Sequence, residues 1–276
     1  MPLPRDPHAQ PHFWRDAALP FLEARWVEDG RRVCYAAHAH SCFSVGAVTA
    51  GRSTYLNGGE RRIIAAGGVV AMNPQVVHAC NPLDGQPWSY VMFYVDTAWL
   101  GALQRELSAS PDGGFQPLPG TFSRDPALFA ALMTLYATLR DASLDPARKR
   151  AEARAFFIRL QGVLGARPAP AGTPVADPLR RAVAFIEAHC TQPLRLEDIC
   201  AEAGLSPSRL IRGFKRHYGL TPHAYLINRR IQRSQHWLRQ GRELAEVALE
   251  AGFADQAHFQ RAFKRHLAAT PGQYRG

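Results

Sequence analysis

The chain has 276 residues, which at roughly 100–200 residues per domain predicts about two domains. Hydrophobic residues make up 46% and charged residues 20%, a balance that excludes wholesale disorder. The formal net charge of +10 points to a polyanionic partner. Residues 177–276 hold 16 Lys and Arg against 9 Asp and Glu, so this third carries +7. That asymmetry is typical of nucleic-acid binding, with an Arg-rich background composition as the alternative.

Several other classes of protein are excluded. Residues 1–10 are polar and Pro-rich and lack the apolar stretch of a secretory signal peptide. No run of about 18 apolar residues occurs, so no membrane-spanning helix is expected. The five cysteines are sparse and odd in number, which argues against a secreted disulfide framework and predicts a reducing, cytoplasmic location.

The first part of the chain, residues 1–165, predicts a β-rich domain that ends in helices. Residues 33–49 and 89–97 are strand candidates, and turn pairs such as Asn57-Gly58 separate the short strands expected between them. This pattern predicts an antiparallel barrel or sandwich. Residues 127–141 and 147–164 then show apolar side chains at helical spacing. These two helices either cover the barrel or form a dimer interface, and the sequence leaves both open.

A linker and an all-helical domain complete the chain. Residues 166–176 are rich in Pro, Ala and Gly and show no periodicity, so they predict a linker. Asp177 and Pro178 predict the start of a helix with Asp177 as its N-cap. Helical patterns continue from there to residue 276, which defines the second predicted domain.

The second domain contains an internal repeat. Twelve residues recur at an offset of 48 before a turn and 49 after it. Each copy predicts a short helix ending at Ala-Gly, a tight turn, and a second helix capped by Ser206 or Asp255. This is the plan of a helix-turn-helix unit, whose second helix enters the DNA major groove. The first members of the repeated pairs are Leu196, Glu202, Ala203, Gly204, Arg212, Phe214, Lys215, Arg216, His217, Thr221, Pro222 and Tyr225.

The second helix of each copy presents candidate DNA-binding side chains opposite its apolar stripe. Arginine pairs bidentately with guanine and glutamine with adenine, whereas lysine suits phosphates. A solvated basic face is the alternative for a single copy, and the duplication favours DNA. The predicted DNA-binding residues are Ser208, Ile211, Arg212, Lys215 and Arg216 in the first copy, and Gln256, Ala257, Gln260, Arg261 and Lys264 in the second.

Residues 251–275 (AGFADQAHFQRAFKRHLAATPGQYR) closely resemble the C-terminal signature of the AraC/XylS family of bacterial transcription regulators. The sequence departs from the family pattern at residues 266–269, where an aromatic and Gly often precede Thr-Pro. The resemblance implies an α+β fold: an N-terminal cupin-like β-barrel with flanking helices, and an all-α domain of two helix-turn-helix units joined by a helix over residues 222–239. It implies a ligand-responsive regulator, usually an activator, that binds promoter DNA, a small-molecule effector and RNA polymerase, and that can form homodimers.

Histidines and cysteines of the first domain point to a ligand site. Alternate side chains of a strand share one face, so residues 34, 38, 40 and 42 are expected together, as are residues 78 and 80. His38-Ala39-His40 with His78 resembles the ligand set of metal cupins, without the carboxylate that cupin enzymes place nearby. The predicted ligands of a zinc-like divalent metal are His38, His40, His78 and Cys80, and the predicted effector contacts are His38, His40, His78, Trp88 and Tyr90.

Three interpretations of these histidines stay open: a metal site, the polar lining of an effector pocket, or structural core histidines. The alternative function is a metal-dependent cupin enzyme or a metal sensor fused to the DNA-binding domain. The missing carboxylate argues against the enzyme, and no catalytic residue is predicted. A DNA-repair regulator with a reactive cysteine would need a motif that lowers a thiol pKa, which the sequence lacks.

Overall fold

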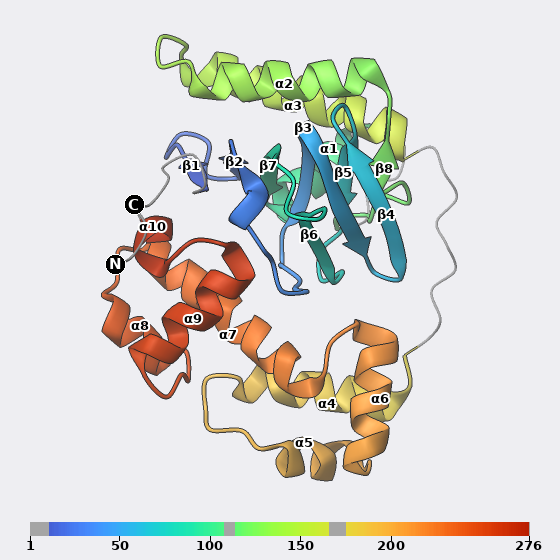
Figure 1. The fold of residues 1–276 in the computed structure, drawn as a ribbon, viewed down its shortest axis with the longest axis vertical. Helices are drawn as coiled ribbons and strands as arrows, with labels where there is room; N and C mark the ends of the chain where they lie inside the picture. Colours follow the sequence, from blue (N-terminus) through green and yellow to red (C-terminus); the bar gives the residue numbers. More distant parts are fainter. Residues whose placement is uncertain (1–10, 108–113, 166–174, 276) are drawn as a thin grey trace.

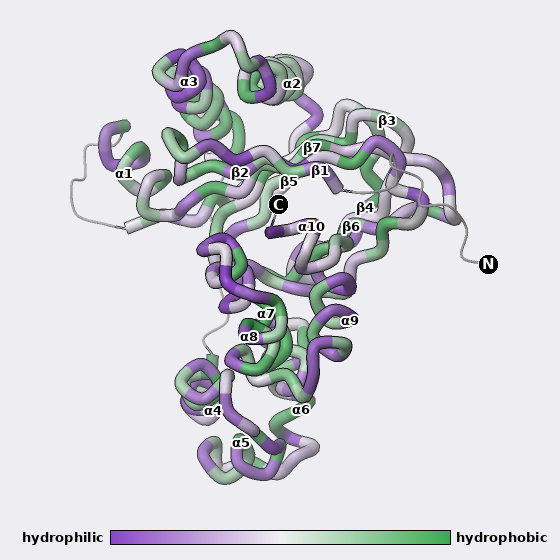
Figure 2. Tube along the Cα trace, turned by 90° about the vertical axis from the view of Figure 1, so that its left-hand side faces the viewer, coloured by the Kyte–Doolittle hydropathy of each residue, from purple (hydrophilic) through white to green (hydrophobic). Residues whose placement is uncertain are grey.

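The computed structural model describes residues 11–107, 114–165 and 175–275 (Figure 1). A sheet domain comes first and a helical domain second, as the sequence predicts. Figure 2 shows three layers: two helices, then the sheet, then the helical domain on the opposite side. Most of the predicted linker, residues 166–174, lies outside the described residues. In the part of the chain that the structure describes, no helix is both long enough and apolar enough to cross a membrane.

The sheet domain is built around one long strand. β3 (Phe43–Asn57) pairs with β5 and β7 along its first half and with β4 and β6 along its second half. A register shift between Val48 and Ala50 precedes Gly51, whose φ is +69° and whose position lies against the Pro87 carbonyl. This bulge bends β3, so that its first half pairs with one group of strands and its second half with another, as in a barrel. The other described strands are β1 (His12–Trp14), β2 (Leu22–Val27), β4 (Glu60–Ala65), β5 (Val69–Met72), β6 (His78–Pro82), β7 (Trp88–Val95) and β8 (Phe122–Ser123).

The segment before β3 differs from the prediction. Residues 33–42 were expected in the strand over residues 33–49, but β3 begins only at Phe43. Instead, Ala36 N donates to Arg265 O at 2.8 Å, and Ala39 N donates to Asn228 Oδ1 at 3.1 Å. Because partners in the helical domain satisfy these backbone groups, the segment does not need a continuous strand ladder. An isolated bridge between His38 and His78 joins it to β6. Asn81 of β6 also accepts from Tyr35 N at 2.6 Å and donates to Tyr35 O at 3.1 Å.

Helices α1 (Thr97–Leu107), α2 (Pro126–Arg140) and α3 (Pro146–Leu164) flank the sheet. Asp125 and Asp145 cap α2 and α3 by accepting backbone N–H bonds, and a proline follows each cap. The leucine stripe of α2 is fully buried in one core with the sheet and α3. Of the two roles that the sequence left open for these helices, the structure shows the first: they cover the sheet (Figure 1).

The helical domain contains the two expected units. The first comprises α4 (Asp177–His189), α5 (Leu196–Ala203) and α6 (Pro207–Tyr218), and the second α8 (Leu244–Glu250), α9 (Gln256–Leu267) and α10 (Pro271–Arg275). The joining helix α7 (Pro222–Arg239) has the predicted bounds. Gly204 ends α5 with φ +64°, as expected.

The predicted N-cap of α4 is wrong by one residue. Ala176 is the N-cap, and Asp177 is the first helical residue. The side chain of Asp177 pairs with Arg180 one turn later, so it is engaged along the helix instead of bonding back to the first turn.

Candidate DNA interface and ligand site

Helices α6 and α9 each bury one face and expose the other. Leu210 and Phe214 of α6 are fully buried, as are Phe259 and Phe263 of α9. Nine of the ten predicted DNA-binding side chains are exposed, and Ile211 is half-buried. The structure therefore exposes the basic residues of both copies to solvent, and the buried apolar faces position both helices.

Helix α7 couples the two units. Leu226 packs in the core of the first unit and Ile231 in the core of the second. Arg230 is buried and donates through Nε to Cys190 O at 2.7 Å and through Nη2 to Gln192 O at 2.8 Å. These bonds fix α7 to the end of α4, so the two units are held in one orientation (Figure 1).

The sheet domain packs against the helical domain along a contact that we call the seam. It comprises residues 36–40, Phe13, Arg15, Glu23 and Val77 on the sheet side. On the helical side it comprises Asn228, Gln232, Arg239, Arg265, His266 and Tyr274. Val77 and Ala39 join the core of the first unit, whereas Phe13 packs edge-on against Tyr274 of the second with ring centroids 5.5 Å apart.

A buried carboxylate lies at the centre of the seam. Glu23 on β2 is 5% exposed. Its Oε2 lies 2.7 Å from Nε of Arg15 and 2.8 Å from Nη2 of Arg239, and its Oε1 lies 3.6 Å from Arg25. Burial alone would raise the pKa of Glu23, but the charges of Arg239, Arg25 and Arg15 together outweigh it and lower the pKa. Glu23 is therefore ionised at neutral pH and links the sheet to α7.

Sequence reasoning missed this cluster. Glu23 and Arg25 stand two residues apart in a strand, so their side chains lie on one face and form a charged pair inside an otherwise apolar element. That pair was the available signal. Arg239, the partner in α7, lies 216 residues away in sequence, and no local pattern connects it to β2.

Two cavities adjoin the seam. The smaller, about 40 Å³, lies inside the sheet domain and has room for only a few waters. The larger, about 650 Å³, lies between the domains. The structure divides the predicted effector contacts between them: His78, Trp88 and Tyr90 line the smaller cavity, His40 lines the larger, and His38 lines both.

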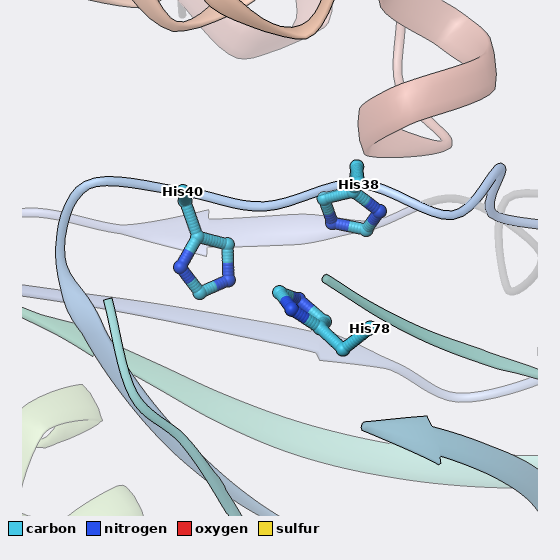
Figure 3. A group of neighbouring side chains, drawn as sticks. All are labelled: His38, His40 and His78. Carbon is cyan, nitrogen blue, oxygen red and sulfur yellow. The ribbon is translucent and has the colours of Figure 1, made fainter. Parts of the chain in front are cut away.

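The three predicted histidines come together. One ligand nitrogen from each of His38, His40 and His78 lies within 4.8 Å of the others, and the three side chains point toward one another with their rings tilted (Figure 3). His78 is supplied by β6, and the other two by the segment before β3. Burial lowers the pKa of His78 to about 4, and burial together with the neighbouring imidazoles lowers the pKa of His38 well below its usual range. The cluster is therefore neutral at pH 7.

Cys80 is not part of this group within the described residues. Its side chain lines the smaller cavity, and burial raises the pKa of its thiol to about 12. The thiol is therefore protonated at neutral pH while no metal is bound. All five cysteines carry free thiols.

Both domains match models of known families. Residues 26–157 match an AraC-like ligand binding domain, and residues 199–276 match a helix-turn-helix domain. The chain belongs to the AraC family of transcription regulators. It combines an effector-binding domain with a DNA-binding domain, and the predicted family, fold class and function are thereby confirmed.

Relatives of this AraC-family regulator are similar over different lengths. The uncharacterized HTH-type transcriptional regulator YbfI from Bacillus subtilis is 24% identical over 231 residues, 80% of each chain. The HTH-type transcriptional activator RhaS from Klebsiella pneumoniae is 34% identical over 98 residues, 35% of each chain. The structure of ToxT from Vibrio cholerae covers 96% of both chains with a TM-score of 0.54 at 13% identity, and it shares the fold.

Proposed function

We propose that this regulator reads promoter DNA by placing α6 and α9 in adjacent major-groove segments about 34 Å apart. The observation that carries the proposal is the repeated pattern of an exposed basic face opposite a buried apolar face. Arg212 and Arg261 occupy matched positions and would contact base edges, and matched Lys215 and Lys264 would contact phosphates. The other base-facing residues are Ser208, Ile211, Gln256, Ala257 and Gln260, with Arg216 a further phosphate contact.

The test of DNA reading is selection of binding sites from a random duplex pool by the full chain. We expect an enriched site with two half-motifs about one helical turn apart. Binding to that site should weaken steeply with salt, because each neutralised phosphate releases counterions. Recovery of no enriched motif, or of one half-motif alone, would contradict the proposal.

Further partners follow from the family. We propose that the protein acts in the bacterial cytoplasm as an activator that contacts RNA polymerase, because RhaS is named as an activator. We also propose a homodimer through the outward faces of α2 and α3, where Ile158 is 36% exposed while the leucine stripe is buried inward. Light scattering of the full chain and of Ile158→Glu tests the dimer, which the variant should weaken.

We place the effector in the larger cavity. Arg15 and Arg25 both line it, and among the described residues Nη2 of Arg15 and Nε of Arg25 are buried without a hydrogen-bond partner. Unpaired buried donors on cations favour an anionic ligand, because desolvated charge needs a partner. ToxT, which shares the fold, has a structure with an unsaturated fatty acid bound. A small organic acid is therefore the proposed class of effector, with His38 and His40 as contacts.

The smaller cavity extends this site. His78, Trp88 and Tyr90 line it, and His38 connects it with the larger one. We propose that these three residues meet a short apolar end of the effector, because the smaller cavity is about 40 Å³ in volume. Because α7 and the end of α9 also line the larger cavity, an acid bound there would change the population of seam arrangements, provided that it binds one of them better.

A thermal-shift screen of organic acids on the full chain tests the effector site. We expect an active acid to raise the unfolding midpoint of the chain, and Arg25→Gln to abolish that rise. The matched control is Arg148→Gln, an exposed arginine on α3, which should keep the response. An acid that acts equally on both variants would contradict this location.

A further inference from the structure

The hydrogen bonds of the histidine cluster fix which ring nitrogen is free. Nδ1 of His38 bonds to Ala36 O at 2.8 Å, and Nδ1 of His78 bonds to Val76 O at 2.9 Å. Nδ1 of His40 bonds to Cys42 O at 3.1 Å. A carbonyl accepts only, so each Nδ1 carries the proton and each Nε2 carries a lone pair.

The three rings are also held close together. The centroid of His78 lies 4.6 Å from that of His38 and 4.5 Å from that of His40. Three lone pairs that converge in this way repel one another unless a donor or a cation lies between them. Within residues 11–107, 114–165 and 175–275, the hydrogen-bond partner of these Nε2 atoms is Ser44 Oγ, 3.3 Å from Nε2 of His40, and a hydroxyl can rotate away.

We propose that His38, His40 and His78 bind one divalent transition-metal ion through their Nε2 atoms. Imidazole is a preferred ligand of zinc and its neighbours in the first transition row, whereas magnesium and calcium prefer oxygen. A carbonyl-bound Nδ1–H behind each ligand is the usual outer shell of such a site. Three protein ligands leave a coordination position for a non-protein ligand.

The larger cavity beside the site carries excess positive charge. Arg25 lines that cavity with His40, and its carboxylate partner Glu23, 3.6 Å away, is shared with Arg15 and Arg239. This charge favours an anionic ligand on the metal. This inference deepens the proposed function and rests on it, because His38 and His40 also line the proposed effector cavity. A carboxylate in that cavity could occupy the remaining position on the metal.

The site also touches the DNA-binding domain. The ring of His266, at the end of α9, lies 6.2 Å from that of His38, and Ala36, the carbonyl partner of His38, donates its N–H to Arg265 O. A metal that fixes His38 therefore also fixes the backbone on which α9 ends. Metal binding should make the seam more rigid on the side of the second unit.

Titration of the chelator-stripped full chain with Co²⁺ tests the site, because bound Co²⁺ has a visible absorption that reports its coordination. We expect saturation at one Co²⁺ per chain. We expect at least about tenfold weaker binding for His78→Gln and for His38→Gln. The matched control is His223→Gln, an exposed histidine at the start of α7, which should bind as the unaltered chain does.

Two measurements keep the result interpretable. Circular dichroism of each variant reports folding, and the half-buried His38 provides the variant least disruptive to packing if His78→Gln unfolds. Binding of the stripped chain to its selected DNA site is measured separately, so failure of the metal site leaves the DNA-binding proposal standing. The inference is overturned if Co²⁺ does not bind, or if folded His38→Gln binds it with unchanged affinity.

Discussion

The two helix-turn-helix units share one plan but meet the sheet domain differently. The first unit meets it through apolar side chains, chiefly Val77 against its core, with Gly219 packed beside Val77. The second unit meets it through the ring contact of Phe13 with Tyr274 and through directed polar bonds, Ala36 N to Arg265 O and Arg15 Nη1 to Tyr274 O at 2.7 Å. The ion pair between Glu23 and Arg239, the last residue of α7, adds to these bonds on the same side.

This difference assigns different roles to the two contacts. Apolar burial is non-directional and tolerates sliding, whereas charge-assisted hydrogen bonds fix geometry. The orientation of the second unit therefore depends on the state of the seam. The first unit follows through α7, which packs in both cores. We therefore expect a ligand at the seam to change the orientation of the second unit, which contains α9, more directly than that of the first unit.

Removing the charge of Glu23 should have the largest effect. Glu23→Gln leaves Arg15, Arg25 and Arg239 around a neutral amide, and breaking such a buried cluster costs about 3 kcal/mol. Urea unfolding should show this loss, and amide exchange should rise in α9 and α10 before α6. The matched control is Glu106→Gln, which breaks an exposed pair with Arg154 and should change little. Equal effects of the two changes would contradict the account.

The same carboxylate predicts a pH dependence. Its pKa lies below the ordinary value of 4.5, so its contribution to stability is present above that value and is lost as the pH falls through the folded-state pKa. The difference in unfolding free energy between the unaltered chain and Glu23→Gln should be constant near neutrality and shrink below about pH 4.5. A difference that grows in acid would refute the assigned ionisation.

Truncating the apolar contact should affect the first unit alone. Val77→Ala removes two buried methyl groups beside Gly219, at a cost of about 1.5 kcal/mol. Amide exchange should increase around α6 and remain unchanged in α9, the opposite of the result expected for Glu23→Gln. If Val77→Ala loosens α9 as much as α6, the two contacts do not act separately.

The caps of α6 and α9 predict the smallest effects. The side chain of Asp255 accepts a hydrogen bond from His258 N at 2.6 Å. Among the described residues of α6, no backbone N–H donates a capping hydrogen bond to the side chain of Ser206. Asp255→Ala should therefore lower stability by about 1 kcal/mol, and Ser206→Ala by less than about 0.5 kcal/mol. Thermal unfolding of the two variants gives the comparison, and a larger loss for Ser206→Ala would contradict it.

Local signals predicted much of this molecule. The bounds of α7 follow from Thr221 and Pro222 at its start, and the buried leucines of α2 follow from their spacing. The segment at residues 33–42 was mispredicted because its partners, such as Asn228, lie 189 residues away in sequence. The His38–His40 motif could be found because its two residues are close in sequence. The bonds that cross the seam could not be found, since each of them joins residues from different domains.

The central claim is that both units read DNA through matched arginines. Its most direct test measures the affinity of Arg212→Ala, Arg261→Ala and the control Arg148→Ala for the selected duplex and for a scrambled duplex. Each recognition-helix variant should lose about 1–3 kcal/mol of binding to the selected site, with little change on the scrambled one, and the control should bind normally. Unchanged specific binding by both Arg212→Ala and Arg261→Ala would contradict the claim.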